Sequence, residues 1–358
     1  REESMAIGID PQRDLYGGLL FHKGRFKRLK RYLRLGAKQC LAEIEPPNNS
    51  DWFGRYLPAG LCLGDAGARD VAIHAIQACI PQATLLPTGV DRLEIDATNT
   101  TGPLFVTASE RLRDGDTFTY DIEVSDEDGR LRERWEGLRL RLVSRLESHV
   151  AWVEPLLGPY IERRVEELIP GVAVRVAVER EESIARHLRS DRAIQRALGS
   201  VMQVGRRCDG KPELTIGEDV EVSAAHAGDL TMAMAGQGPL GCDVEQVDAR
   251  SATVWRDLLG PERFALAELV ARQREELRDI AATRVWVASE SLKKAGATVG
   301  VPLLMESATS DGWVILSAGE FVAATYLAST RSSESKIVLG LLVRRDNARL
   351  RVPAHGRL

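Results

Sequence analysis

The chain has 358 residues, which is long for a single core and suits two domains of roughly 100–200 residues each. Its 48 basic and 52 acidic side chains leave a formal net charge of -4, and this near balance argues against a nucleic-acid-coating protein and a polybasic membrane binder. Hydrophobic residues make up 44% and charged residues 28%, which indicates a folded globular protein rather than a disordered one.

The cysteines, histidines and uncharged stretches do not favour a secreted, zinc-binding or membrane protein. The six histidines form no HExxH motif, and the uncharged stretch 71–90 contains Pro81 and Pro87, which makes it a poor membrane span. The chain begins Arg-Glu-Glu-Ser, without an initiator Met or a signal sequence. We therefore expect part of a longer cytoplasmic protein with no membrane or nucleic-acid partner. Its five cysteines contain no CxxC pair and are expected to be free thiols: Cys40, Cys62, Cys79, Cys208 and Cys242.

The first part of the chain predicts antiparallel strands around one helix. Residues 66–80 carry Val71, Ile73, Ile76 and Ile80 at helical spacing, as in a helix enclosed on most sides. Residues 105–112 and 117–143 alternate as strands, and Asp128-Gly129 marks a hairpin turn within the second stretch. We predict that a curved antiparallel sheet wraps a helix over residues 1–148.

The second part changes to a mixed pattern of helices and strands. Residues 149–170 are helical but interrupted by prolines, and we predict a connecting linker there. Beyond it, residues 171–346 predict a strand at 172–179, a helix at 190–203, two strands within 220–247, a long helix pair over 255–296 and closing strands at 312–318 and 336–344. Residues 347–358 would be a C-terminal tail. The predicted fold class is α+β.

Asp243 and Glu245 lie two residues apart in the segment Gly-Cys-Asp-Val-Glu. On a strand this spacing points both carboxylates to one face and Val244 to the opposite, core face. Hard divalent cations such as Mg²⁺ bind oxygen ligands of this kind. Solvated carboxylates on an edge strand are the alternative.

About forty residues later, Trp286, Glu290 and Lys294 recur at intervals of four. They would share one helix face, where Glu290 and Lys294 could also form an ordinary surface ion pair.

Together, GCDVE, a spacer of about forty residues and WxxxExxxK resemble the signature of the longer, surfactin-synthetase-activating type of 4′-phosphopantetheinyl transferase. That resemblance implies a pseudo-dimer of two similar α/β halves. Upstream, the segments 196–199, 210–212 and 223–226 resemble the family's coenzyme A-binding helix, its GKP turn and its strand ending in His. Two positions depart from the family pattern: Ser289 replaces the usual Lys before the helix Glu, and alanines rather than hydroxyl residues flank His226.

The resemblance implies a reaction and a role for each residue. A serine of an acyl carrier protein would attack the β-phosphate of coenzyme A and expel 3′,5′-adenosine bisphosphate, so charge on the pyrophosphate needs a metal and cations. Glu290 would be the general base, directly or through a water. The implied Mg²⁺ ligands are Asp243, Glu245 and Glu290, and the implied coenzyme A phosphate ligands are Arg196, Lys211, His226 and Lys294.

In the first part, Asp70 and His74 share one helix face in apolar surroundings. A buried carboxylic acid there would have a raised pKa and could exchange protons near neutrality, while a structural i,i+4 hydrogen-bonded pair is the alternative. The helix, with residues 15–26 and 135–142, resembles the second hot-dog half of a polyketide synthase dehydratase. In that family a His from the first half, in an HxxxGxxxxP motif, works with the helix Asp. This chain has no such motif, so Asp70, with Asp65 as its rival, would need an upstream hot dog; His22 is the first candidate for a second group within the chain.

The order of these two parts resembles the end of an enediyne-type iterative polyketide synthase. The expected partners are coenzyme A, an acyl carrier protein and a second copy of the parent synthase in a homodimer. Two other interpretations stay open: a docking module that binds carrier protein without catalysis, and a dehydratase acting alone. The first is suggested by Ser289 and opposed by the intact Asp243, Glu245, Glu290 and Lys294 set; the second is opposed by the missing His half.

Overall fold

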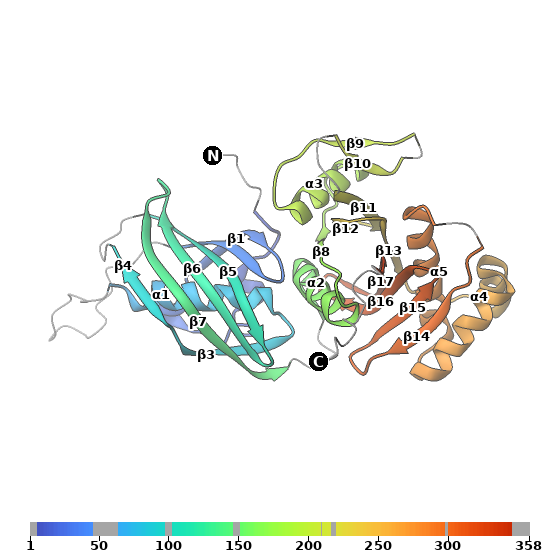
Figure 1. The fold of residues 1–358 in the computed structure, drawn as a ribbon, viewed down its shortest axis with the longest axis horizontal. Coiled ribbons are helices and arrows are strands. Elements are labelled where there is room, and N and C mark those ends of the chain that lie inside the picture. The colour runs from blue at the N-terminus through green and yellow to red at the C-terminus, as the bar shows by residue number, and fades with distance from the viewer. Residues whose placement is uncertain are drawn as a thin grey trace, which may run out of the picture. The chain divides into compact units, whose positions relative to one another are not determined.

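The structure, a computed structural model, describes residues 6–45, 64–96, 102–145, 151–208, 210–215, 220–297 and 300–345 (Figure 1). It divides into two compact units, Arg1–Glu147 and Ser148–Leu358. The predicted tail 347–358 lies outside the described residues. Among the residues that are described, no helix is both long enough and apolar enough to cross a membrane.

The first unit consists of an antiparallel sheet and a short helix. The strands run in the order β1-β2-β5-β6-β7-β3, with β4 also paired to β7. The helix α1 (Ala66–His74) continues in a 3-10 turn at Ala75–Cys79, and shorter helical turns at Pro11–Leu15 and Gly24–Phe26 precede the sheet. The strands are β1 (Leu29–Leu35), β2 (Gln39–Ile44), β3 (Ala83–Gly89), β4 (Arg92–Ile95), β5 (Leu104–Asp114), β6 (Thr117–Asp126) and β7 (Leu131–Arg145).

The predicted wrapping of the helix by the sheet is confirmed. Alternate side chains of β6, from Phe118 to Val124, are buried, and they belong to the same core as the fully buried Val71 of α1 and Ile76 of the following turn. That turn contacts β1, β2 and β3. The predicted hairpin is present as β6–β7, and Gly129 takes a positive φ of 79° in its turn. The first unit therefore has a hot-dog-like fold.

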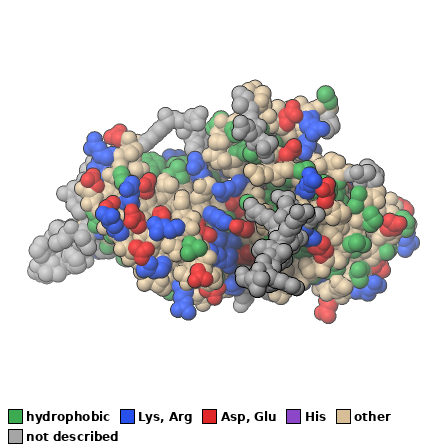
Figure 2. All heavy atoms as spheres, viewed as in Figure 1, with side chains coloured by type: hydrophobic (Ala, Val, Ile, Leu, Met, Phe, Trp, Pro, Cys, Tyr) green, Lys and Arg blue, Asp and Glu red, His purple; other side chains and the backbone are tan. Residues whose placement is uncertain are grey.

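Acidic and basic side chains are interspersed over the visible face of the first unit (Figure 2). The ion pairs of the first unit include Arg111–Asp121, Arg134–Glu123 and Arg139–Asp91. All these side chains are substantially exposed, so each pair contributes little to stability. They keep the outer face of the sheet charged and hydrated.

The second unit contains two larger antiparallel sheets, a small hairpin and four helices in its described residues. One sheet has the order β11-β12-β8, the other β13-β17-β16-β15-β14, and β9 pairs with β10. The helices are α2 (Leu157–Leu168), preceded by a 3-10 turn at Glu154–Leu156, α3 (Arg186–Leu198), α4 (Ala252–Arg274) and α5 (Arg278–Lys294). The strands are β8 (Val174–Arg180), β9 (Val204–Arg206), β10 (Pro212–Leu214), β11 (Val220–Ala227), β12 (Leu230–Gln237), β13 (Leu240–Gln246), β14 (Leu304–Ala308), β15 (Trp313–Ala318), β16 (Phe321–Thr330) and β17 (Ser333–Arg344).

The segment 220–247 forms three strands, where the sequence predicted two. The third strand arises because the chain reverses twice, at turns that contain Gly228 and Gly238. Both glycines have positive φ values. The third strand, β13, pairs with β17 and so belongs to the five-stranded sheet. The strand with Asp243 and Glu245 therefore lies where the two sheets meet, because β13 also contacts β11.

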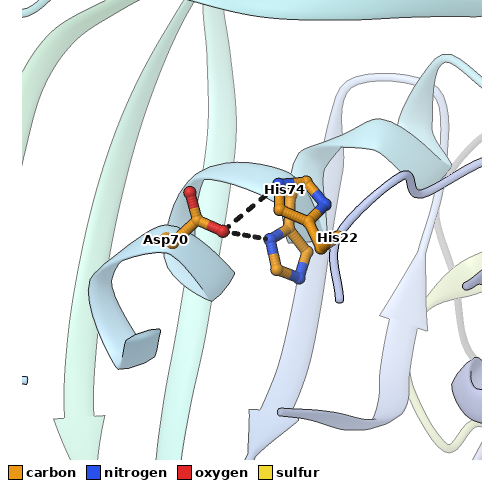
Figure 3. A group of neighbouring side chains, drawn as sticks. All are labelled: His22, Asp70 and His74. Atoms are coloured by element: carbon orange, nitrogen blue, oxygen red, sulfur yellow. Dashed lines mark hydrogen bonds and ion pairs between the residues drawn. The ribbon is translucent and has the colours of Figure 1, made fainter. Parts of the chain in front are cut away.

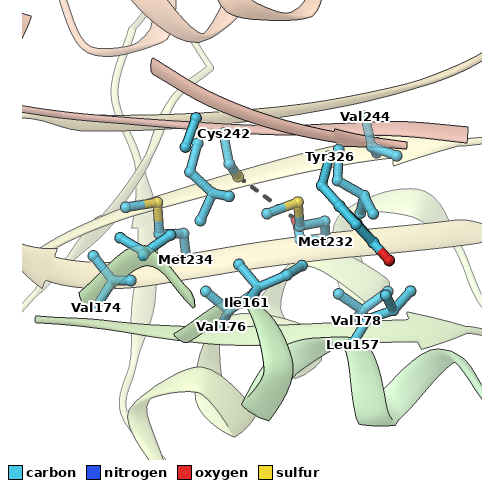
Figure 4. Packing of buried hydrophobic residues seen from close by; sticks show 14 of the residues in the cluster. Leu157, Ile161, Val174, Val176, Val178, Met232, Met234, Cys242, Val244 and Tyr326 are labelled. Carbon is cyan, nitrogen blue, oxygen red and sulfur yellow. Dashed lines mark hydrogen bonds between the residues drawn. The ribbon is translucent and has the colours of Figure 1, made fainter. Parts of the chain in front are cut away.

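The core between the two sheets also includes α2, which we had predicted as part of a linker over 149–170. Leu157 and Ile161 of α2 are fully buried against β8 and β12, and the same cluster contains Tyr326 and Val244 from the five-stranded sheet (Figure 4). The prediction that Val244 points into the core is confirmed. The prolines that suggested a linker lie at the start of this helix and after its end, where proline is tolerated.

Candidate functional site

In the first unit, α1 presents Asp70 to a pocket of about 560 Å³. Its lining is mainly apolar and includes Leu19, Ile73 and Leu140. Asp65, the rival carboxylate, caps the start of α1: its Oδ1 accepts hydrogen bonds from the backbone N–H groups of Gly67 and Ala68, and its Oδ2 pairs with Arg28 at 2.8 Å. The structure thus assigns Asp65 a structural role and leaves Asp70 facing the pocket.

Two histidines meet at the same oxygen of Asp70 (Figure 3). Asp70 Oδ2 lies 3.1 Å from His74 Nδ1 and 3.2 Å from His22 Nε2. The two imidazole rings stack, with centroids 4.0 Å apart. The i,i+4 spacing predicted the contact with His74. It could not predict the contact with His22, which the preceding loop brings in from far along the chain.

Tyr16 orients His74 from the side away from Asp70. Its hydroxyl oxygen lies 3.1 Å from His74 Nε2 and accepts a hydrogen bond from the backbone N–H of Leu29 at 3.1 Å. The tyrosine hydrogen is then available to His74 Nε2, which leaves the imidazole N–H on Nδ1 to donate to Asp70. Burial raises the pKa of Tyr16 to about 12, so the phenol stays protonated.

Burial lowers the pKa of the His22 imidazole below its ordinary value, the neighbouring His74 lowers it further, and Asp70 opposes both effects. Its Nδ1 is buried and has no hydrogen-bond partner. The pocket therefore combines a carboxyl group, two imidazoles and an apolar wall, which are groups that can exchange protons with a bound molecule.

In the second unit, Lys294 joins three elements. Its Nζ forms an ion pair with Asp243 Oδ1 at 2.8 Å and donates to the backbone oxygens of Cys242 at 3.0 Å and Ala224 at 3.5 Å. These partners lie on β13 and β11, whereas Lys294 ends α5. The possible ion pair between Glu290 and Lys294 is therefore not formed. Glu290 pairs with Lys293 instead, at 2.6 Å.

Two glycines let α5 lie this close to the sheet. A Cβ atom on Gly241 of β13 would come within 2.2 Å of the Ser291 backbone oxygen, and one on Gly340 of β17 within 2.3 Å of a Val287 methyl carbon. Neither approach is possible for any residue with a side chain, so both positions require glycine.

The negative charges of Asp243 and Glu245, which lie near Lys294, are only partly balanced by positive charge. Burial raises the pKa of Asp243, with a further rise from Glu290, although Lys294 opposes it. Burial and Asp243 likewise raise the pKa of Glu245, which accepts a hydrogen bond from Trp286 Nε1 at 3.4 Å. Asp243 Oδ2 is buried without a hydrogen-bond partner. These carboxylates fit a divalent cation, which would satisfy the unpartnered oxygen and the excess negative charge.

The three predicted metal ligands are not gathered tightly. In the described part of the chain, the group of three potential ligand side chains with atoms within 4.8 Å of one another is His22, Asp70 and His74, and not Asp243, Glu245 and Glu290. Ser289, which replaces the family's usual Lys, is buried, and its hydroxyl donates to the Val285 backbone oxygen at 2.7 Å.

His226 lies among positive charges at the end of β11. Its ring nitrogens contact Ser190 Oγ at 2.8 Å and Thr231 Oγ1 at 2.9 Å. Burial and then the cations around it lower the pKa of His226 to about 4. Those cations are Arg186, Arg189, Lys294 and Arg206. Such a concentration of positive charge favours an anion.

Two predicted phosphate ligands are engaged by carboxylates instead. Arg196 forms a largely buried ion pair with Glu179, and burial lowers the pKa of this guanidinium. Lys211 pairs with Glu221 at 3.0 Å. The sequence had indicated neither Arg186 nor Arg206. Their proximity to His226 depends on how α3 and the β9–β10 hairpin fold beside β11, which no local pattern shows.

Comparisons with known proteins bear on the first unit. Residues 2–149 match the family model of the polyketide synthase dehydratase N-terminal domain. The match covers less than half of the chain and shows that this part is similar to a polyketide synthase dehydratase domain. The matching model describes an N-terminal domain, whereas the motifs in the sequence had suggested a second half. No match was found among curated proteins.

Several of the similar solved structures are parts of polyketide synthases. They include a trans-acyltransferase polyketide synthase enoyl-isomerase, with 20% identity and a TM-score of 0.28 over 34% of this chain and 50% of that chain. The dehydratase domain of RzxB from Pseudomonas fluorescens has 19% identity and a TM-score of 0.27 over 34% and 42%. The dehydratase domain from the CurJ module of Curacin polyketide synthase has 18% identity and a TM-score of 0.29 over 34% and 44%. The chain spans half or less of the length of each.

Proposed function

We propose that the second unit transfers 4′-phosphopantetheine from coenzyme A to a serine of an acyl carrier protein. The observation that carries this proposal is the position of Lys294, whose ammonium group links Asp243 on β13 to the cations around His226. An acidic group and a cationic group thus lie side by side. A pyrophosphate substrate with a bound metal requires both.

The residues of the acidic group hold the metal and handle the proton. Asp243, Glu245 and Glu290 would hold Mg²⁺, which supplies charge stabilisation for the pyrophosphate oxygens when bound. The serine oxygen forms a bond to the β-phosphorus, and the bond from that phosphorus to the oxygen of 3′,5′-adenosine bisphosphate breaks. Glu290 takes the serine proton, directly or through a water. Its side chain is partly exposed, with 24% accessible, so a carrier protein could reach it.

The cationic group binds the phosphates of coenzyme A. His226 and Lys294 keep the roles that the sequence resemblance implied, and Arg186, Arg189 and Arg206 join them because their charges act on the same imidazole. Arg196 and Lys211 would contribute only if substrate drew them away from Glu179 and Glu221. We therefore assign them a lesser share of the binding.

The test uses the full chain, coenzyme A, Mg²⁺ and apo carrier proteins from polyketide pathways. Mass spectrometry should show the phosphopantetheine mass on the carrier serine, and chelation of the metal should prevent it. No mass gain on any carrier protein, including that of the parent synthase, would favour the alternative of a docking module that binds carrier protein without catalysis.

A second proposal concerns the first unit, because its pocket contains Asp70. We infer that it acts on β-hydroxyacyl thioesters of a carrier protein and that Asp70 protonates the leaving hydroxyl group. Both histidines of the unit contact Asp70 itself, so neither stands across a substrate from it. A base from another hot-dog half would complete the reaction. The order of dehydratase and transferase, as at the end of an enediyne-type synthase, supports this arrangement by analogy.

A further inference from the structure

In the pocket of the first unit, His22 and His74 each turn one ring nitrogen toward Asp70 Oδ2 (Figure 3), and the three potential ligand atoms lie within 4.8 Å of one another. Asp70 Oδ2 lies 3.2 Å from His22 Nε2 and 3.1 Å from His74 Nδ1. Ligand atoms about 2.1 Å from a tetrahedral ion lie about 3.4 Å from one another. These two separations are therefore close to those between neighbouring ligands of one metal ion, and the third lies within 4.8 Å.

We propose that these three atoms bind a divalent transition-metal ion of the zinc class, such as Zn²⁺ or Co²⁺. Two imidazole nitrogens and one carboxylate oxygen suit such ions, whereas Mg²⁺ and Ca²⁺ prefer oxygen ligands alone. The site is distinct from the carboxylates of the second unit. The proposal does not rest on the transferase function of the second unit. An ion held by Asp70 would prevent this residue from donating a proton, so the dehydratase role proposed above belongs to the metal-free chain.

Neighbouring residues hold the three ligands in place before an ion arrives. The Tyr16 hydroxyl contacts His74 Nε2 at 3.1 Å, which is the outer contact that a metal-bound histidine usually makes. His22 is stacked between Phe21, at a centroid distance of 4.3 Å, and His74, at 4.0 Å. Asp70 sits on α1, whose first turn is fixed by Asp65 and its ion pair with Arg28. The three side chains are therefore already held in position, and metal binding would cost little conformational entropy.

The protons can rearrange to free the three ligand atoms. On binding, His74 would lose its Nδ1 hydrogen and carry one on Nε2, donating it to the Tyr16 hydroxyl. That hydroxyl can turn its own hydrogen to the Phe26 backbone oxygen, which lies 3.5 Å away. His22 would carry its hydrogen on Nδ1, the atom that now has no partner. No net proton has to leave if Asp70 is already ionised.

The pocket gives the ion an entrance and a free coordination position. All three side chains line the cavity of about 560 Å³, and 32% of the Asp70 side chain is accessible. A small molecule or water could therefore complete the coordination, as in sites with three protein ligands.

The test is a cobalt titration of the full chain, with excess Mg²⁺ present to occupy sites made of oxygen ligands. We expect one equivalent of Co²⁺ to bind with visible absorption bands of a low-coordinate site. His22→Ala should weaken this binding by on the order of 10²-fold, and Tyr16→Phe by about 10–100-fold because His74 loses its outer contact. The matched control is His187→Ala, since His187 is exposed on α3 and should leave the bands unchanged.

Two measurements keep the result clear of folding effects. Circular dichroism should show each variant folded, with His22→Gln as the replacement if the alanine variant is not. In the unaltered chain, Zn²⁺ should shift the imidazole carbon and proton NMR signals of two histidines and leave the others in place. A cobalt spectrum that survives both His22 variants, or Zn²⁺ that shifts no pair of histidines, would overturn the proposal.

Discussion

Lys293 and Lys294 are adjacent in sequence but serve different carboxylates. Lys294 binds Asp243 and two backbone oxygens, whereas Lys293 is more exposed and pairs with Glu290 while its ammonium lies 5.6 Å from the Trp286 ring centroid. Consecutive positions on a helix point about 100° apart, so one residue can face the sheet and the next can face solvent. The positive charge next to Glu290 therefore comes from Lys293, which partly offsets the absence of a Lys at position 289.

Glu290→Gln should leave the fold intact and lower the transferase rate by on the order of 10²–10⁴, the usual range for loss of a general base. The amide can still accept a hydrogen bond from Lys293 but cannot take the serine proton. Carrier-protein mass spectrometry over time measures the rate. Glu268→Gln is the matched control, because Glu268 pairs with Arg278 at 3.0 Å on an exposed helix face. An undiminished rate in Glu290→Gln would make Glu290 a surface residue.

The stability of the second unit should depend on pH through His226. Burial and the surrounding cations lower the pKa of His226 from 6.5 to about 4 in the folded state, so the unfolded state binds the proton first. The stability from this group is complete above pH 6.5 and is lost as the pH falls from 6.5 to about 4. Urea unfolding at a series of pH values should show a shallower loss in His226→Gln than in the unaltered chain, and no such change in His187→Gln. Equal slopes in all three proteins would contradict the prediction.

At the scale of elements, α2 holds the two sheets of the second unit together. Leu157 is fully buried in the core that these sheets share, whereas 49% of Leu188 on α3 is exposed. Leu157→Ala should therefore lower the free energy of unfolding by about 2–5 kcal/mol, and Leu188→Ala by less than about 0.5 kcal/mol. Chemical denaturation of the full chain, followed by the unfolding of the second unit, measures both. Similar small losses in the two variants would mean that α2 is the linker expected from the sequence.

Local patterns predicted the elements better than their contacts. Alternation and the Asp128-Gly129 turn predicted the β6–β7 hairpin, and the spacing of four predicted the contact between Asp70 and His74. Contacts between distant segments were not predictable from the sequence alone. His22 reaches Asp70 because the loop before β1 folds over α1, and Lys294 reaches Asp243 because α5 packs on β13. Prolines near α2 suggested a linker because proline marks helix ends as well as breaks.

At the scale of the whole molecule, the two units carry chemistry that can be tested separately. The chain alone should not dehydrate a β-hydroxyacyl thioester, because dehydration needs an acid and a base on opposite sides of the substrate and both histidines here lie on the acid. Adding a second hot-dog half that carries the catalytic histidine should restore dehydration. Asp70→Asn should then abolish it, as mass spectrometry of the carrier-bound product would show.

Asp65→Asn provides the control for that experiment. Asparagine keeps a side-chain oxygen that can cap α1 but loses the charge that pairs with Arg28, so dehydration should persist provided that circular dichroism shows the variant folded. If activity survived in Asp70→Asn and disappeared in Asp65→Asn, the acid would be Asp65. A dehydrated product from the present chain alone would point to His22 as the second catalytic group.

The glycines at 241 and 340 have a consequence for anyone who wishes to alter the second unit. The helix α5 carries Glu290 and Lys294, and the strand β13 carries Asp243. These two elements can lie so close together because positions 241 and 340 have no side chain. A single added methyl group at position 241 would act as a spacer under α5 and move Glu290 and Lys294 away from Asp243. If the proposed transferase function holds, substrate preference is therefore better redesigned at Arg186 or Arg206, whose side chains can change without altering the distance between helix and sheet.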